Sequence, residues 1–134
     1  MSLPKVFMTQ RIQDVGMSIL EGRVDLTLWS EEGRPDPEAV MRDLPYADGL
    51  IMTMGIAMDR SFFKMAERLR VASLYSVGYD NVDIKAATEF GVMVTNTPGV
   101  LTDATADTAL MLMLMTARKA MENERIMREG GWAH

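Results

Sequence analysis

The chain contains no cysteine and a single histidine, His134, which is the last of its 134 residues. Without cysteine it can form neither disulfides nor thiolate metal sites. A terminal histidine has no ordered neighbours to orient it, so we predict that it is no general base and that no Ser/His/Asp set can be assembled. None of the ten glycines forms the motif G-x-G-x-x-G, and no metal-ligand spacing is present. We therefore expect no metal site and no catalytic residue in this chain.

Basic clusters and long apolar runs are also missing. The net charge is −5 and no Lys/Arg cluster offers a phosphate-binding surface, which argues against nucleic acid as a partner. The longest apolar run, residues 109–115, is far shorter than the roughly 20 residues that cross a bilayer. The apolar stretch before Gln10 is too short for a signal peptide. We expect a cytoplasmic protein with no membrane segment.

Short β-type runs alternate with helical patterns along the first hundred residues. The expected strands are residues 6–8, 24–29, 50–54, 71–75 and 92–95. Three expected helices lie between them: one begins with Asp36 and Pro37, one begins at Asp59, and one runs from about 82 to 90 and stops at Gly91. This alternation predicts an α/β fold, a flavodoxin-like sheet of five parallel strands with helices on both faces.

The last segment predicts one long C-terminal helix, from Thr102 to about residue 128, with Thr102 or Asp103 as its N-cap. Its residues 109–115 are apolar on every side, and a helix of this kind has to be enclosed. One small sheet cannot enclose it, so we expect the helix to pack against further chain or a second copy. The expected domains are residues 1–101 and 102–134, and the expected assembly is a homodimer or higher oligomer formed through helix 102–128.

Two backbone amides after the fourth expected strand are the first candidates for ligand binding. Ligands bind beyond the carboxyl ends of parallel strands, and Val77 and Gly78 lie there. A helix that begins near Asn81 would add the positive end of its dipole. Gly78 either lets a ligand approach the backbone closely or takes a backbone angle that other residues avoid. The alternative is a plain turn, with Asp80 or Asn81 as a helix cap.

Other residues would line the same crevice. Met52, Met54 and Gly55 end the third expected strand, and core packing is the alternative role for the methionines. Thr105, in the first turns of the long helix, could offer its hydroxyl to a ligand, or it could be solvated or bonded to its own backbone. We predict Met54 as a substrate contact and Thr105 as a ligand contact.

The ends of the first and third strands argue against two common flavodoxin-like activities. A receiver domain needs an acidic pair after the first strand and an aspartate after the third, where this chain has Thr9 and Gln10, and Thr53. No Ser/Thr/Gly loop for a flavin phosphate follows the first strand. We therefore expect neither phosphoacceptor chemistry nor a bound flavin.

Four stretches form a recognisable set: S-V-G-Y-D-N-V-D at 76–83, A-A-T at 86–88, V-T-N-T-P-G-V-L-T-D-A-T-A-D at 94–107, and G-G-W at 130–132. Together they resemble the D-isomer-specific 2-hydroxyacid dehydrogenases, and most closely the glyoxylate and hydroxypyruvate reductase branch. The resemblance implies a two-domain, usually dimeric enzyme. Such an enzyme passes hydride between NAD(P)H and a 2-oxo acid in the cleft between its domains.

Within that family the chain resembles the N-terminal substrate-binding lobe plus the long helix that leads into the nucleotide-binding lobe. The resemblance assigns Val77 and Gly78 to the substrate carboxylate and Thr105 to the nicotinamide end of NAD or NADP. The family's G-x-G-x-x-G, its carboxylate-binding Arg and its Glu and His acid/base pair would follow beyond His134. We expect part of an oxidoreductase that reduces a small 2-oxo acid to the D-2-hydroxy acid, with no turnover by this chain alone.

A self-standing, non-catalytic module for ligand binding or oligomerisation, with the same fold, is the alternative hypothesis. The reading frame after His134 distinguishes the two, because a continuation into G-x-G-x-x-G indicates a truncated enzyme. The apolar helix favours truncation, since a natural module is expected to carry polar residues there.

Overall fold

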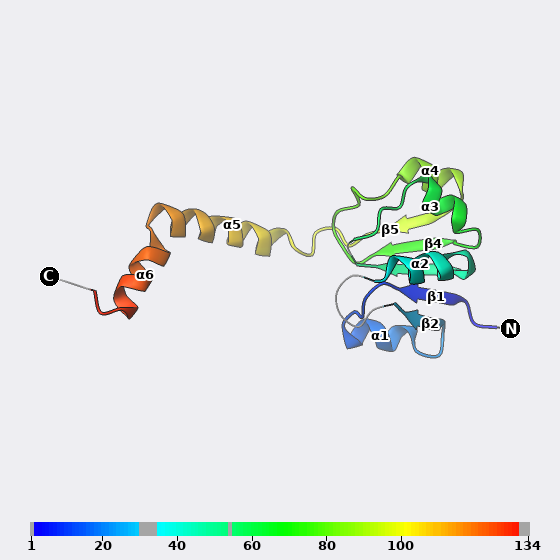
Figure 1. Ribbon diagram of the computed structural model, residues 1–134, viewed down its shortest axis with the longest axis horizontal. Coiled ribbons are helices and arrows are strands. Elements are labelled where there is room, and N and C mark those ends of the chain that lie inside the picture. The colour runs from blue at the N-terminus through cyan, green and yellow to red at the C-terminus, as the bar shows by residue number, and fades with distance from the viewer. Residues whose placement is uncertain (1, 30–34, 54, 132–134) are drawn as a thin grey trace. The chain divides into compact units, whose positions relative to one another are not determined.

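The computed structural model describes residues 2–29, 35–53 and 55–131, and its five strands form one parallel sheet (Figure 1). The strand order is β2-β1-β3-β4-β5, and each neighbouring pair is parallel. The strands are β1 (Lys5–Met8), β2 (Asp25–Leu28), β3 (Gly49–Met52), β4 (Val71–Leu74) and β5 (Met93–Thr95). The predicted flavodoxin-like α/β sheet is confirmed.

Helices connect successive strands and follow the last one. They are α1 (Asp14–Leu20), α2 (Pro37–Asp43), the 3-10 helix η1 (Leu44–Tyr46), α3 (Arg60–Met65), α4 (Ile84–Glu89), α5 (Thr102–Ala117) and α6 (Ala120–Arg128). Helix α1 was not among the predicted helices. Its N-cap, Gln13, makes no side-chain hydrogen bond, so the capping signal that marks α2 and α3 is absent there. None of the helices in the described ranges combines the length and apolar character needed to cross a membrane.

The predicted helix caps of the sheet domain are present. The Asp36 carboxylate accepts a hydrogen bond from the Glu38 amide at 3.1 Å, with Pro37 as the first helical residue. The Asp59 carboxylate accepts from the Phe62 amide at 2.9 Å. Gly91, with φ of +70°, ends α4 in the left-handed conformation that glycine adopts without a steric penalty.

One face of the sheet carries the hydrophobic core. Phe7, Leu50 and Ala72 are paired across β1, β3 and β4, so their side chains point to the same face. The core residues that cover this face come from α2, η1, α3 with its C-cap Ala66, and α4, and they include Val40, Leu44, Phe62, Phe63, Ala86 and Ala87. These helices lie on the same face because the connections that contain them all run across the sheet in the direction of β5 and are right-handed.

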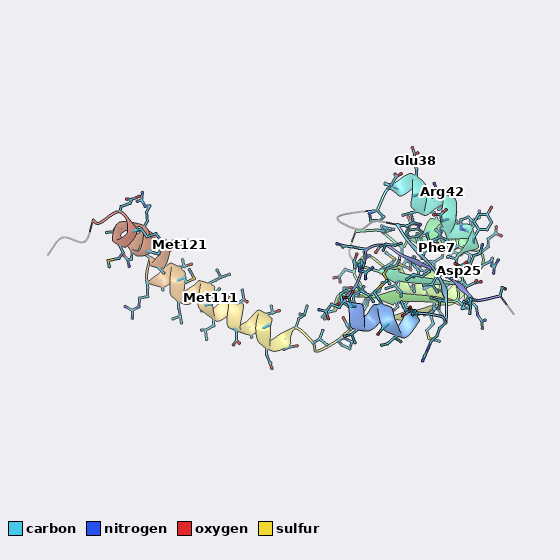
Figure 2. All side chains as sticks on the ribbon, turned by 90° about the horizontal axis from the view of Figure 1, so that it is seen from below. Phe7, Asp25, Glu38, Arg42, Met111 and Met121 are labelled. Carbon is cyan, nitrogen blue, oxygen red and sulfur yellow. The ribbon has the colours of Figure 1, made fainter. Side chains whose placement is uncertain are left out.

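Helix α1 lies on the opposite face of the sheet. Figure 2 shows α1 and α2 on opposite sides of the strands, with Glu38 and Arg42 on the outer side of α2. Helix α1 buries no residue completely. It lies on this face because the β1 to β2 connection runs across the sheet in the other direction.

The chain forms two compact units, Met1–Pro98 and Gly99–His134, and the second contains α5 and α6. The predicted C-terminal helix is confirmed, but it is divided into α5 and α6, because the chain turns at Lys119, whose φ is 49°. The Asn123 side chain donates a hydrogen bond at 3.0 Å to the Arg118 carbonyl, one of the groups that the end of a helix leaves without a partner. The predicted cap is wrong, since the N-cap of α5 is Leu101, which makes no side-chain hydrogen bond.

Candidate functional site

The loop after β4 presents two backbone amides at the carboxyl edge of the sheet. Val77 is 38% exposed, and Gly78 is exposed as well. Within the described part of the chain, neither N–H group donates a hydrogen bond to a protein acceptor. Backbone N–H groups without partners are strong donors, so this loop can bind an anion.

The backbone angle of Gly78 tests one of the explanations predicted for this glycine. Its φ is not positive, whereas five other described glycines have positive φ values. The explanation from an unusual backbone angle is therefore wrong. The atom nearest to an added Cβ is Oδ2 of Asp80, at 3.4 Å, so the space beside Gly78 is otherwise open. Close approach of a ligand to the backbone and a plain turn both stay predictions for Gly78.

Side chains on both sides of the loop bind its carbonyl groups. The Asn96 amide nitrogen donates to the Val77 carbonyl at 2.8 Å, and the Ser76 hydroxyl donates to the Gly78 carbonyl at 2.8 Å. The Thr97 amide donates to the Ser76 carbonyl at 2.9 Å. In a trans peptide the C=O and the following N–H point in opposite directions. Because Asn96 holds the Val77 carbonyl, the Gly78 N–H points away from Asn96.

The predicted contribution of a helix dipole beside this loop is wrong. Helix α4 begins at Ile84, not near Asn81, and the Asp83 carboxylate caps it by accepting from the Ala86 amide at 2.9 Å. Residue Val82 is extended instead, since it forms a parallel bridge with Met58. The donors of the site are therefore the two loop amides without a helix terminus.

Neither Asp80 nor Asn81 caps α4, which corrects the alternative interpretation of these residues. The Asn81 side chain donates a hydrogen bond at 2.7 Å to the Ile56 carbonyl in the loop after β3. The Met58 amide donates to the Asn81 carbonyl at 2.8 Å, and the Asp83 amide donates to the Met58 carbonyl at 2.9 Å. The loops after β3 and β4 are joined by these three bonds.

The structure treats the three residues that were predicted to line the crevice at the end of β3 differently. Met54 lies outside the described residues. Met52 is fully buried in the core, so core packing is its role and it does not line the crevice. Gly55 is exposed, and its φ of +124° is a backbone angle that favours glycine.

A polar cluster that the sequence analysis did not identify lies at the ends of β1 and β3. Thr9 is the buried polar residue of the described core, with 1% of its surface exposed. Its hydroxyl oxygen accepts from the Thr53 amide at 2.9 Å and lies 3.1 Å from the Thr53 hydroxyl oxygen. The Thr53 hydroxyl donates to Oε1 of Gln10 at 3.4 Å. The available signal was the position of polar residues directly after two adjacent parallel strands.

Thr105 belongs to the second unit and lies in α5. Its amide donates to the Leu101 carbonyl at 2.9 Å, and its side chain is exposed. Thr108 bonds its hydroxyl to the Ala104 carbonyl at 2.8 Å, whereas the Thr105 hydroxyl has no partner among the described groups. A hydroxyl bond to the helix backbone, one of the alternatives predicted for Thr105, is therefore present at Thr108 and not at Thr105.

The recess beside the loop after β4 is small. It has a volume of about 200 Å³ and is lined by Tyr79, Ile84, Val94, Thr95 and Asn96. Among the larger recesses, one of about 870 Å³ lies at the amino edge of the sheet and one of about 510 Å³ lies between α2 and α3. No group of three His, Asp or Glu residues that could hold a metal ion occurs in the described ranges.

At the amino edge of the sheet, the Asp48 carboxylate is bonded to two neighbouring groups. The Asp48 carboxylate accepts from the Lys5 amide at 2.9 Å and from the Arg68 guanidinium at 2.8 Å. These contacts hold the pKa of the Asp48 carboxyl below its usual range, with the Lys5 amide as the largest cause. The Asp48 carboxylate is therefore occupied by groups of the protein itself.

Comparison with known proteins connects this geometry to a family. The family model of the D-isomer specific 2-hydroxyacid dehydrogenase catalytic domain matches residues 6–129. A glyoxylate reductase of Pyrococcus horikoshii is 42% identical over 129 residues, which are 96% of this chain and 39% of that protein. This chain thus spans about two fifths of that relative.

Solved structures agree with this match. A protein from Thermus thermophilus has a TM-score of 0.82 and 37% identity, over 97% of this chain and 42% of that one. An NADPH-dependent glyoxylate/hydroxypyruvate reductase from Sinorhizobium meliloti, solved with NADP and malonate, has a TM-score of 0.76 and 29% identity, over 98% of this chain and 40% of that one.

Proposed function

Because this chain belongs to the D-isomer specific 2-hydroxyacid dehydrogenase family, we propose that it is the substrate-binding part of an NAD(P)-dependent oxidoreductase. The proposed reaction reduces a small 2-oxo acid, such as glyoxylate or hydroxypyruvate, to the D-2-hydroxy acid. The observation that carries the proposal is the pair of exposed amides at Val77 and Gly78, which have no acceptor among the described groups. Residues 1–101 form the proposed substrate lobe, and residues 102–134 begin the second lobe.

In the proposed complex the two amides bind the carboxylate of the 2-oxo acid. A carboxylate accepts hydrogen bonds through two oxygens, so each oxygen can take one of the two N–H groups. Because Asn96 holds the Val77 carbonyl at 2.8 Å, the Gly78 amide keeps a fixed direction. The carboxylate in turn orients the adjacent keto carbon, which is the atom that is reduced. Positioning of this kind lowers the barrier of a reaction between two bound molecules.

The nicotinamide cofactor supplies the hydride in this family of reactions, and the described residues account for little of its binding. The Thr105 hydroxyl is exposed and has no partner among the described groups, so it fits one polar contact near the nicotinamide. The phosphates do not fit the start of α5, because Asp103 lies in its first turn and repels an anion. We propose that the dinucleotide phosphates are bound by other polypeptide.

We propose that the 134-residue chain alone does not turn over substrate. Loss of a general acid/base removes about 10²- to 10⁴-fold in rate, and loss of the electrostatic contacts to the reacting groups lowers the rate further. Oxidation of NADH or NADPH by the isolated chain with glyoxylate or hydroxypyruvate is expected to stay at the background rate. A clear rate would overturn this part of the proposal.

A chimera tests the binding role directly. In it, the chain replaces the matched 129 residues of the Pyrococcus horikoshii glyoxylate reductase, which supplies the remaining 61% of the enzyme. We expect NAD(P)H-dependent reduction of glyoxylate by the folded chimera. The matched control carries Gly78→Val, which places a branched side chain beside the two amides. A folded, cofactor-binding chimera with no activity on any 2-oxo acid would count against the proposal.

We also propose that the chain associates with a second copy through α5. Taken by itself, the second unit leaves five consecutive residues between 50% and 68% exposed, namely Leu110, Met111, Leu112, Met113 and Leu114. An apolar surface of this kind drives association. Light scattering is expected to give a dimer or higher oligomer, and the double variant Leu110→Glu with Leu114→Glu is expected to give a monomer. A wild-type monomer would refute this assembly.

A further inference from the structure

The ends of β1 and β3 are the point where the connections of the sheet diverge. The chain leaves β1 toward β2 at one side of the sheet, and it leaves β3 toward β4 at the other side. Crevices open at such switch points, and ligands bind there in open α/β sheets. Thr9, Gln10 and Thr53 lie at this position. The polar cluster therefore lies where a ligand is expected, one strand away from the loop after β4.

The hydrogen bonds of the cluster have a defined direction. The Thr53 hydroxyl has a single proton, and it donates that proton to Oε1 of Gln10. The contact of 3.1 Å between the two threonine hydroxyls must then be a donation from Thr9 to Thr53. The Thr9 oxygen in turn accepts from the Thr53 amide at 2.9 Å. The cluster thus ends at the carbonyl oxygen of the Gln10 side chain.

This direction determines what Gln10 can offer to a ligand. With its carbonyl oxygen bonded to Thr53, the side chain keeps its NH₂ group, which carries two donors and has no acceptor among the described groups. Gln10 is half-buried, so this group lies near the surface. Arg11, the nearest cation in the sequence, is paired with Asp14 at 3.0 Å. The Gln10 NH₂ group is neutral and, among the described residues, no free cation lies beside it. It therefore suits a neutral oxygen of a ligand, such as a hydroxyl, better than a second carboxylate of the ligand.

We propose that Gln10 determines substrate specificity by donating a hydrogen bond to a hydroxyl group on C3 of the 2-oxo acid. This inference rests on the proposed function, in which Val77 and Gly78 bind the carboxylate. Strands β1 and β4 are both neighbours of β3, so they lie about 10 Å apart. A three-carbon acid and an extended glutamine side chain together span that distance. Thr9 and Thr53 are positioning residues, because they act through Gln10.

Pyruvate and hydroxypyruvate test the proposal, because they differ only in the hydroxyl on C3. The ¹⁵N-labelled 134-residue chain is titrated with each acid and observed by NMR. Both acids are expected to shift the amide signals of Val77 and Gly78, and only hydroxypyruvate is expected to shift the side-chain NH₂ pair of Gln10. The Gln10→Met variant assigns that pair by its disappearance. One net hydrogen bond predicts about three- to tenfold tighter binding of hydroxypyruvate.

The ratio of the dissociation constants of pyruvate and hydroxypyruvate, compared among variants, is the second measurement. Gln10→Met is expected to bring the ratio of the two dissociation constants close to one. Thr53→Val, which lacks the hydroxyl, is expected to lower the ratio, whereas Thr53→Ser, which keeps it, is expected to preserve it. Shifts at Val77 and Gly78 without a shift at Gln10 would overturn this inference and leave the proposed function in place. No shift at Val77 and Gly78 with either acid would overturn both, and the wild-type titration alone decides this.

Discussion

The two edges of the sheet use similar polar groups in opposite ways. At the amino edge, the Asp48 carboxylate accepts from the Lys5 amide and from Arg68, so this acceptor is satisfied by donors of the protein. At the carboxyl edge, the N–H groups of Val77 and Gly78 have no acceptor among the described residues. The larger recess, about 870 Å³, is at the amino edge. The comparison teaches that the volume of a recess and the presence of polar groups without partners are separate properties, because the larger recess does not lie beside the two amides.

The largest expected effect comes from adding one methyl group at the carboxyl edge. Gly78→Ala places a Cβ beside the two free amides, where a carboxylate would have to lie. We expect at least a tenfold loss of affinity for hydroxypyruvate, measured by NMR titration. The fold should be retained, because the nearest atom to the new Cβ is Asp80 Oδ2 at 3.4 Å and the φ of Gly78 is not positive. An unchanged affinity in the folded variant would contradict the close-approach role of Gly78.

A change at the amino edge should affect stability and leave binding unchanged. Asp48→Asn removes the charge that accepts from Lys5 and Arg68, and we expect the free energy of unfolding to fall by about 1–2 kcal/mol. Urea denaturation measures this value. Asp25→Asn, on the neighbouring strand end, is the matched control and should change stability by less than about 0.5 kcal/mol. A loss of hydroxypyruvate affinity in Asp48→Asn would break the separation between the two edges.

The smallest expected effect is a dependence of stability on acid pH. The pKa of the Asp48 carboxyl is lowered in the folded protein, so as the pH falls below about 4 the unfolded chain binds a proton before the folded chain does. Stability contributed by Asp48 is therefore present above that pH and lost below it. Asp59 acts in the same direction, because Ser61 and the Phe62 amide lower its pKa. Urea midpoints between pH 5 and pH 3 should fall less steeply in Asp48→Asn than in the wild type. Equal slopes would exclude Asp48 as a cause.

The sequence predicted the parts of the fold that depend on local signals. Two helix starts are marked by a side-chain acceptor, namely Asp36, which precedes Pro37, and Asp59. The structure contains both caps. The parallel sheet was predicted from local signals too. Burial leaves a pattern of apolar residues that marks each strand and helix, and the alternation of these elements predicts parallel strands. Gly91 marked the end of α4 because a positive φ there favours glycine.

The errors lie where distant contacts override the local signals. The sequence around Val82 predicts a helix that begins there. The bridge from Val82 to Met58 keeps this residue extended, so α4 begins at Ile84. The turn that ends α5 lies at Lys119, a residue that does not normally predict a positive φ. The bond between Thr9 and Thr53 joins residues 44 positions apart, and the sequence places both residues directly after strands without showing that their side chains meet.

The bridge between Met58 and Val82 has a consequence for recognition. Together with the Asn81 bond to Ile56 and the Asn96 bond to Val77, it attaches the loop after β4 to segments on both of its sides. The conformational entropy of the loop is therefore lost when the sheet forms and not when a ligand arrives. In the proposed complex, a rigid, preorganised donor pair loses little further freedom on association, which favours the binding of a small acid by few contacts.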